Sequence, residues 1–317
     1  MEAFEAQIPA MVSRDANHPS IVIWGLYNEE WGLDWDVPGD PAKQQAVHRA
    51  FDLLKDLDDS RPAVDNSGWA HVETDLVDWH VYDETPKGWS AKVRALLGGR
   101  VDSFPVAIAT DTIVEKKLMA AGGAPPVALP NLNSEYGGGY TSVERGWNLR
   151  WQTQELRRHD TLSGYVWTEL TDIEHETAGL VAFDRSSRDL GGNDPATTNA
   201  PTVLVVDLTP HSPGVDLVTD GPVSLEVHVS HHGTHPLEAR LVAHWGPLLR
   251  DPTTTELLAS HAEAPSTATI TAKPYQLTSG RRVEVHLPDA AAAARLTLAL
   301  IADGAVVARA AIDVQQG

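Results

Sequence analysis

Short apolar runs alternate with segments of helical apolar spacing along the first half of the chain. Residues 20–27 form the clearest run, mostly apolar and β-branched, which is typical of a strand buried on both faces. Four further strands are predicted, at 61–65, 75–82, 127–133 and 163–168. Five helices are predicted around them, at 3–16, 41–58, 90–98, 110–121 and 142–159. This alternation predicts a parallel sheet with right-handed crossovers.

The helix predicted at 41–58 has the clearest start signal. Asp40 is a favourable N-cap and Pro41 fits the first helical turn. Phe51 and Leu54 then fall on one face of the helix. We therefore expect an amphipathic helix that covers the sheet.

The apolar period changes to two in the second half of the chain, after turn-forming residues at 186–201. Val223 and Leu225 begin an alternation of apolar and polar residues. Asp303 and Gly304 lie between two apolar runs, which is a strong hairpin signal. These features predict an all-β, immunoglobulin-like sandwich.

The change of period divides the chain into a first domain, a linker and a sandwich. The expected boundaries are 1–185, 186–201 and 202–317.

Composition narrows the class of partner. The 317 residues include 44 acidic and 24 basic ones, and the net charge of −20 argues against nucleic acid or an anionic membrane surface as partner. The absence of cysteine excludes disulfides, a thiolate nucleophile and a Cys-ligated metal. No run of eighteen apolar residues and no basic-then-apolar leader is present, so a cytoplasmic location is expected.

Polar and aromatic side chains gather at the carboxyl ends of the predicted strands. In α/β barrels this end of the strands carries the chemistry. We therefore expect a binding or catalytic site there. The residues concerned are Asn28, Glu29, Asn66, Trp69, His80, Tyr82, Glu135, Trp167 and Glu169.

Two of these residues suit glycoside hydrolysis. A retaining glycosidase uses one carboxylic acid to protonate the leaving oxygen and one carboxylate as nucleophile, about 5–5.5 Å apart. Glu29 and Glu135 follow different strands and can supply this pair. Strand alternation directs Glu30 away from Glu29, so Glu29 is the expected acid.

An ordered series of segments resembles glycoside hydrolase family 2, which includes β-galactosidases, β-glucuronidases and β-mannosidases. The resemblance covers roughly residues 1–185. The segments that carry it are 14–21 with Trp24, Asn28-Glu29, 65–69, 78–82, 133–137 and 164–169.

The resemblance implies a role for several residues. Glu29 is implied as acid/base and Glu135 as nucleophile. Asn28 would bind the sugar 2-hydroxyl, Tyr82 would hold the nucleophile, and Trp167 would form the floor of the sugar subsite. The expected substrate is a β-glycoside, with a galactoside preferred, and neither a cofactor nor a metal is expected.

The resemblance also implies a partial TIM (β/α)₈ barrel. The five predicted strands would be about strands 4–8 of the eight, and the others are expected from a complementing N-terminal segment or a homo-oligomer.

Two other functions fit the same residues. The chain can be a non-catalytic sugar-binding or assembly remnant of such an enzyme. Alternatively, His71, Asp78, His80 and Glu84 can be ligands of a metal-dependent hydrolase. We favour a role for His80 as a hydrogen-bonding wall of the pocket.

Overall fold

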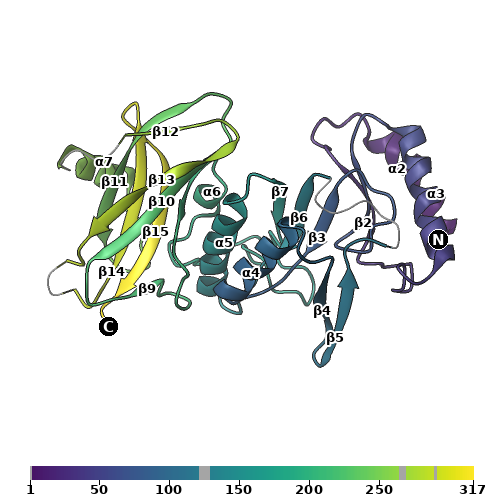
Figure 1. Ribbon diagram of the computed structural model, residues 1–317, viewed down its shortest axis with the longest axis horizontal. Helices are drawn as coiled ribbons and strands as arrows, with labels where there is room; N and C mark the ends of the chain where they lie inside the picture. Colours follow the sequence, from purple (N-terminus) through teal and green to yellow (C-terminus); the bar gives the residue numbers. More distant parts are fainter. Residues whose placement is uncertain (1, 121–128, 264–268, 289–290) are drawn as a thin grey trace. The chain divides into compact units, whose positions relative to one another are not determined.

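The computed structural model describes residues 2–120, 129–263, 269–288 and 291–317 (Figure 1). The described residues form two compact units, and the chain passes between them several times. Unit 1 comprises Met1–Tyr82, Lys92–Tyr136 and Thr161–Val166. Unit 2 comprises Asp83–Ala91, Gly137–Asp160 and Trp167–Gly317. No helix in the described part of the chain is long and apolar enough to cross a membrane.

Unit 1 contains short parallel sheets, a hairpin and covering helices. Its helices are α1 (Glu2–Glu5), α2 (Ile8–Asp15), α3 (Pro41–Leu57) and the second part of α4 (Pro86–Leu97). Its strands are β1 (Trp24–Asn28), β2 (Ala63–Ser67), β3 (Val77–His80), β4 (Ser103–Ala109), β5 (Thr112–Lys117), β6 (Asn131–Tyr136) and most of β7 (Leu162–Trp167).

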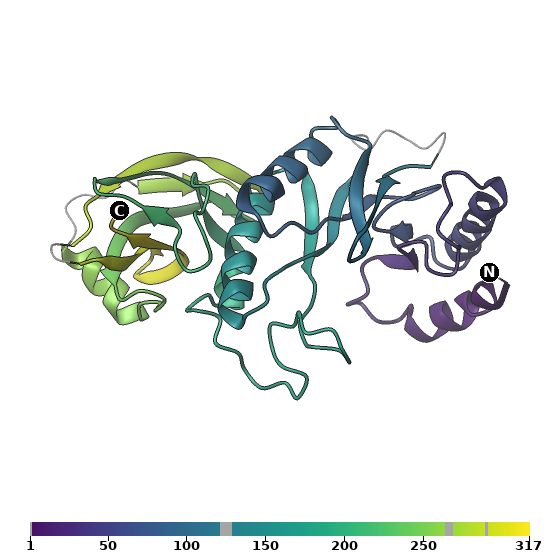
Figure 2. The ribbon, with the colours of Figure 1, turned by 90° about the horizontal axis from the view of Figure 1, so that it is seen from below.

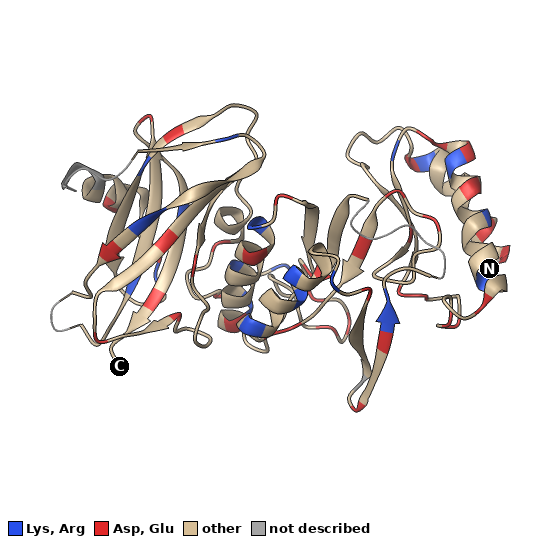
Figure 3. Ribbon diagram, viewed as in Figure 1, with Lys and Arg blue, Asp and Glu red and all other residues tan. Residues whose placement is uncertain are grey.

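Helix α3 confirms the prediction for 41–58. The Asp40 side chain caps it by accepting hydrogen bonds from the backbone N–H groups of Ala42 and Lys43. Phe51 and Leu54 are buried, whereas acidic and basic residues are interspersed along the helix (Figure 3). The apolar stripe therefore fixes which face of α3 packs inward.

The five predicted strands are present, in two sheets rather than one. β1 pairs in parallel with β2, and β3 pairs in parallel with β6, which also neighbours β7. The register places Asn28 beside Ser67 and His80 beside Glu135. Because parallel strands end at the same edge, the polar residues that follow them are brought together in unit 1.

The helix predicted at 110–121 is wrong, because this segment contributes β5 to an antiparallel hairpin with β4. Thr110 and Asp111 form the turn, and Val106 pairs with Val114. β-branched residues favour extended backbone, and the hairpin returns the chain to the end of β2. There the His71 N–H donates to the Leu118 carbonyl at 3.0 Å.

Unit 2 contains two sheets that share one apolar core. Its helices are α5 (Ser142–Arg157), α6 (Pro195–Thr198) and α7 (Thr254–Glu263), with the first part of α4. Its strands are β8 (Thr202–Val206), β9 (Leu217–Val218), β10 (Val223–His231), β11 (Leu237–Gly246), β12 (Thr269–Ala272), β13 (Gln276–Val285), β14 (Ala293–Ala302) and β15 (Ala305–Gln315). The sheet orders are β13-β10-β8 and β12-β11-β14-β15-β9.

The period-two pattern is visible in the packing of unit 2. Val223 and Leu225 are buried and their neighbours along β10 are exposed. Both sheets contribute to the core, for example through Leu225 and Leu298. At the predicted hairpin, Asp303 and Gly304 have φ angles of 49° and 74°, as a type I′ turn requires. Helix α5 packs against β8 (Figure 1, Figure 2).

The predicted linker at 186–201 lies inside unit 2 and is bonded to its core. The guanidinium of Arg295, which is fully buried, donates to the carbonyls of Gly191 and Gly192 at 2.8 and 2.9 Å. The same group makes two 2.8 Å bonds to the Asp313 carboxylate. The compact units therefore divide the chain differently from the predicted domain boundaries.

We expect the segment 186–201 to resist proteases as long as Arg295 is present. Arg295→Met removes the donors that hold two backbone carbonyls and leaves Asp313 buried without its cation, which is strongly destabilising. Limited proteolysis followed by mass spectrometry should then show cleavage within 186–201. The exposed Arg282→Met is the control and should behave as the unmodified chain does. Rapid cleavage at 186–201 in the unmodified chain would contradict this prediction.

Candidate active site

The backbone turns sharply where β1 ends. Glu29 and Glu30 have φ angles of 52° and 62°, in the left-handed region that few non-glycine residues adopt. The turn is held against β2, because the Glu29 N–H donates to the Ser67 carbonyl at 2.9 Å and the Glu30 N–H donates to Asn66 Oδ1 at 3.0 Å. As a result Glu29 lines a cavity, whereas Glu30 is buried.

Glu30 has a complete set of buried partners. One carboxylate oxygen accepts from the Val37 N–H at 3.0 Å, and the other accepts from Trp69 Nε1 at 2.9 Å. The second oxygen also pairs with the ammonium of Lys116, which lies over the rings of Trp35 and Trp69. Lys116 falls within the helix predicted at 110–121, so the sequence does not indicate its place beside the cavity. The signal that could have revealed it is the Thr110-Asp111 turn between β-branched runs.

Two carboxylates face each other across a histidine. His80 Nδ1 lies 2.9 Å from Glu29 Oε1 and 3.5 Å from Glu135 Oε2, and one oxygen of each carboxylate lies within 4.8 Å of the other. The Tyr82 hydroxyl donates to Glu135 Oε2 at 2.7 Å. These four residues, Glu29, His80, Tyr82 and Glu135, are called the carboxylate cluster below.

The far side of the His80 ring is also held. Nε2 lies 3.0 Å from Ser67 Oγ and 2.9 Å from Ser134 Oγ. Both hydroxyls donate to Asp78, which is buried. The ring orientation is thus set by side chains from three strands, and Nδ1 is directed at the carboxylates. Sequence patterns did not single out either serine.

The ligand set predicted for a metal hydrolase is not the group that the structure brings together. Both ring nitrogens of His71 are bonded within the protein, at 2.7 Å to Asp65 Oδ1 and 2.7 Å to the Asp78 carbonyl. Across the residues that the structure describes, the ligand atoms close enough to hold an ion belong to Glu29, His80 and Glu135.

Burial raises the pKa of Glu135 above its ordinary value. The electrostatic interaction with His80 and the hydrogen bond from Tyr82 lower this pKa, and the Glu29 carboxylate adds to the increase. Ionised Glu135 is therefore stabilised by specific partners against the effect of its surroundings.

Tyr82→Phe is expected to raise the pKa of Glu135 further. The hydroxyl bonds the charged form, so its removal favours the protonated form. If ionised Glu135 is needed for turnover, the acidic limb of the kcat/KM profile moves to higher pH. The matched control is Tyr140→Phe at an exposed tyrosine, which should leave the limb unchanged. A limb that moves to lower pH in Tyr82→Phe would be inconsistent with this assignment.

The carboxylate cluster opens into a cavity of about 460 Å³ within unit 1. This volume lies in the range typical of small-molecule sites. Most of the lining outside the cluster is aromatic or aliphatic. The lining residues are Glu29, Trp31, Trp35, Trp69, His80, Val81, Tyr82, Pro105, Val106, Ala107, Ile108, Lys116 and Glu135.

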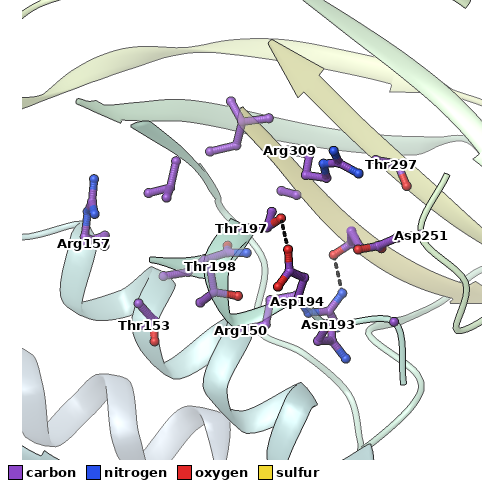
Figure 4. A pocket seen from close by; sticks show the side chains of 16 residues that line it. Arg150, Thr153, Arg157, Asn193, Asp194, Thr197, Thr198, Asp251, Thr297 and Arg309 are labelled. Atoms are coloured by element: carbon purple, nitrogen blue, oxygen red, sulfur yellow. Dashed lines mark hydrogen bonds between the residues drawn. The ribbon is translucent and has the colours of Figure 1, made fainter. Parts of the chain in front are cut away.

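Unit 2 has a much smaller cavity between α5, the segment 192–198 and the sheets (Figure 4). Its volume is about 30 Å³, which is room for one or two water molecules. Asn193 Oδ1 and Thr297 Oγ1 are buried there with no partner in the described residues. A sugar ring does not fit, so the candidate site is the cavity of unit 1.

The first part of the chain is similar to known glycoside hydrolases. Residues 1–94 match the family model described as "Glycosyl hydrolases family 2, TIM barrel domain". A curated relative, "Beta-galactosidase 2" of Enterobacter cloacae, is 36% identical over 101 residues, which is 29% of this chain and 9% of the relative. The resemblance to glycoside hydrolase family 2 is confirmed over residues 1–94.

Solved structures of glycosidases are similar to the chain over most of its length. A β-D-mannosidase from Dictyoglomus thermophilum has a TM-score of 0.56 at 12% identity, over 97% of this chain and 40% of that one. An FMN-binding β-glucuronidase from Facaelibacterium prausnitzii L2-6 has a TM-score of 0.45 at 14% identity, over 100% of this chain and 44% of that one. The mannosidase shows a likeness of fold alone. The chain spans less than half the length of each of these proteins.

The remaining residues predicted from the family 2 resemblance lie at different places. Trp69 is buried, and the centroids of its indole ring and of the His80 ring are 5.9 Å apart in an edge-to-face arrangement. Asn28 ends β1 with an exposed side chain and is absent from the described lining of the cavity. Trp167 and Glu169 belong to unit 2, where burial raises the pKa of Glu169 and the carboxylates of nearby acidic residues add to this increase.

Proposed function

We propose that this chain carries the two catalytic carboxylates of a retaining β-glycosidase of family 2. The observation that supports this most directly is the approach of Glu29 and Glu135 to within 4.8 Å, at the edge of a cavity and on either side of His80. Retaining glycosidases place their carboxyl groups about 5–5.5 Å apart, whereas inverting ones leave about 6.5–9.5 Å for a water molecule.

The proposed reaction has two steps. A Glu135 oxygen forms a bond to the anomeric carbon while the glycosidic bond breaks, and Glu29 gives its proton to the leaving oxygen. Water then gives a proton to Glu29 and attacks the anomeric carbon, which releases the sugar and restores both side chains. Tyr82 holds the attacking carboxylate, and His80 stabilises negative charge on either acid.

The supporting roles follow the resemblance. Asn28 would bind the 2-hydroxyl of the sugar, and Trp69, His80 and Tyr82 would line the subsite. Strands β1, β2, β3, β6 and β7 would be about strands 4–8 of a (β/α)₈ barrel, with residues 202–317 as an immunoglobulin-like sandwich. A β-galactoside is the preferred substrate, since the curated relative is named a β-galactosidase.

Covalent labelling tests this function. The protein is incubated with 2-deoxy-2-fluoro-β-D-galactosyl, glucosyl and mannosyl fluorides, whose fluorine slows hydrolysis of the glycosyl-enzyme. Peptide mass spectrometry should then find one sugar on Glu135, and Glu135→Gln should take up none. Binding of the sugar without any label would favour the non-catalytic alternative, and a label on Glu29 would reverse the two roles.

A further inference from the structure

The cavity beside the carboxylate cluster continues along a loop with two partly exposed tryptophans. Trp31 is 62% exposed and Trp35 is 40% exposed, although both line the cavity. Their ring centroids are 5.3 Å apart at an angle of 75°, which is an edge-to-face pair. Large aromatic surfaces that stay open beside a binding cavity are typical of a ligand contact.

The loop that carries these tryptophans is held in place. Leu33 and Val37 are fully buried, and the side-chain amide of Gln44 donates to the Val37 carbonyl at 2.9 Å. The Val37 N–H is in turn bonded to Glu30. The aromatic surface is therefore already ordered before a ligand arrives, which lowers the entropic cost of binding.

The other part of the lining comes from the hairpin. Residues 105–108 of β4 contribute proline, valine, alanine and isoleucine to the cavity. Lys116 is the charged residue of this part, and its ammonium is paired with Glu30 and covered by the rings of Trp35 and Trp69. The pair neutralises the charge, so this part of the described lining offers little to an anionic group.

Polar partners are scarce away from the carboxylate cluster. Apart from Lys116 and indole N–H groups, every polar side chain in the described lining belongs to the cluster. A second sugar would bury several hydroxyls there without partners, at a cost for each. A flat apolar group would instead bury surface against tryptophan and aliphatic side chains, which is favourable.

We propose that this region is an aglycone subsite for a planar, apolar leaving group, so that the substrate class is aryl or similarly apolar β-glycosides rather than oligosaccharides. This inference rests on the proposed function. It assigns Trp31, Trp35 and Ile108 to recognition of the aglycone.

Binding of non-hydrolysable thioglycosides tests the subsite without turnover. Three 1-thio-β-glycosides that differ in the aglycone, which is methyl, 2-naphthyl or glucosyl, are compared by calorimetry. Their glycosyl unit is the sugar that labels Glu135, or galactose if no sugar labels it. The naphthyl compound should bind roughly tenfold or more tighter than the methyl compound. Trp31→Ala and Ile108→Ser should each lower the ratio of the two affinities, naphthyl over methyl, several-fold.

Ile113→Ser is the matched control, because Ile113 lies on the same hairpin, is 71% exposed and is absent from the cavity lining. It should keep the ratio of the unmodified protein. A ratio near one, a ratio unchanged in Trp31→Ala, or tighter binding of the glucosyl compound would overturn the inference. If Glu135 is labelled and the ratio is near one, the subsite alone is wrong. If Glu135 is unlabelled and no thioglycoside binds, the proposed function fails with it.

Discussion

Glu135→Gln is expected to lower kcat on an aryl β-glycoside by about 10⁴-fold or more, the scale seen when an enzyme loses its nucleophile. The amide retains the shape of the side chain and can still accept the Tyr82 hydrogen bond, but it cannot form a stable ester with the anomeric carbon. Steady-state kinetics measure the loss of kcat, with an aryl β-glycoside of the sugar that labels Glu135 as substrate.

Glu29→Gln should behave differently. It removes the proton donor but leaves the nucleophile, so the first step suffers least when the leaving group needs no proton. The loss in kcat/KM, which reports the first step, should therefore be small for a dinitrophenyl glycoside and large for an unactivated phenyl or alkyl glycoside. The value of kcat on the dinitrophenyl glycoside should still fall, because the second step needs Glu29 to take a proton from water. Equal losses in kcat/KM across this series would contradict the acid/base assignment. Near-normal turnover in Glu135→Gln would contradict the nucleophile assignment.

A large effect on stability is expected at the pair of Glu30 and Lys116. Lys116→Met leaves the Glu30 carboxylate buried without its cation, and removing one partner of a buried ion pair costs about 3–5 kcal/mol. Urea unfolding followed by tryptophan fluorescence measures the change, since Trp35 and Trp69 surround the ammonium. Glu30→Gln alone should also destabilise, because it leaves the ammonium unpaired.

The double variant Glu30→Gln with Lys116→Met separates the loss of the pair from the cost of an isolated charge. It should recover part of the stability lost in Lys116→Met, because no unpaired charge remains in the interior. Arg250→Met breaks a pair with Glu256 whose side chains are exposed, and should change the free energy of unfolding by at most about 1 kcal/mol. A loss in Lys116→Met as small as that in the control would mean that the Glu30–Lys116 pair is not buried in solution.

Local sequence signals predicted the elements with a clear physical cause. Asp40 and Pro41 predicted where α3 begins, and Asp303 and Gly304 predicted the hairpin between β14 and β15. The strand ends predicted that the residues of the carboxylate cluster lie together, because parallel strands end at one edge. These signals depend on neighbours along the chain, so one sequence is enough to read them.

Features that depend on distant contacts were not predictable in the same way. The segment 110–121 has residues compatible with a helix, and pairing with β4 decides its state. Strand alternation correctly predicted that Glu30 points away from Glu29. The physical cause is different, because both residues lie beyond β1 and have left-handed backbone conformations. The partner of Glu30 lies 86 positions away, and nothing near Glu30 in the sequence indicates it.

The hairpin of β4 and β5 has a consequence for how this protein can vary. At its tip, Thr110 and Asp111 are exposed, so insertions and deletions of a few residues should be accepted there. At its base, a deletion that shifts the register by one residue turns Lys116 outward and leaves the Glu30 carboxylate buried without its cation. Changes in length should therefore concentrate at the tip. A library that varies the tip while retaining 116–118 is the natural starting point for altering which leaving groups the protein accepts.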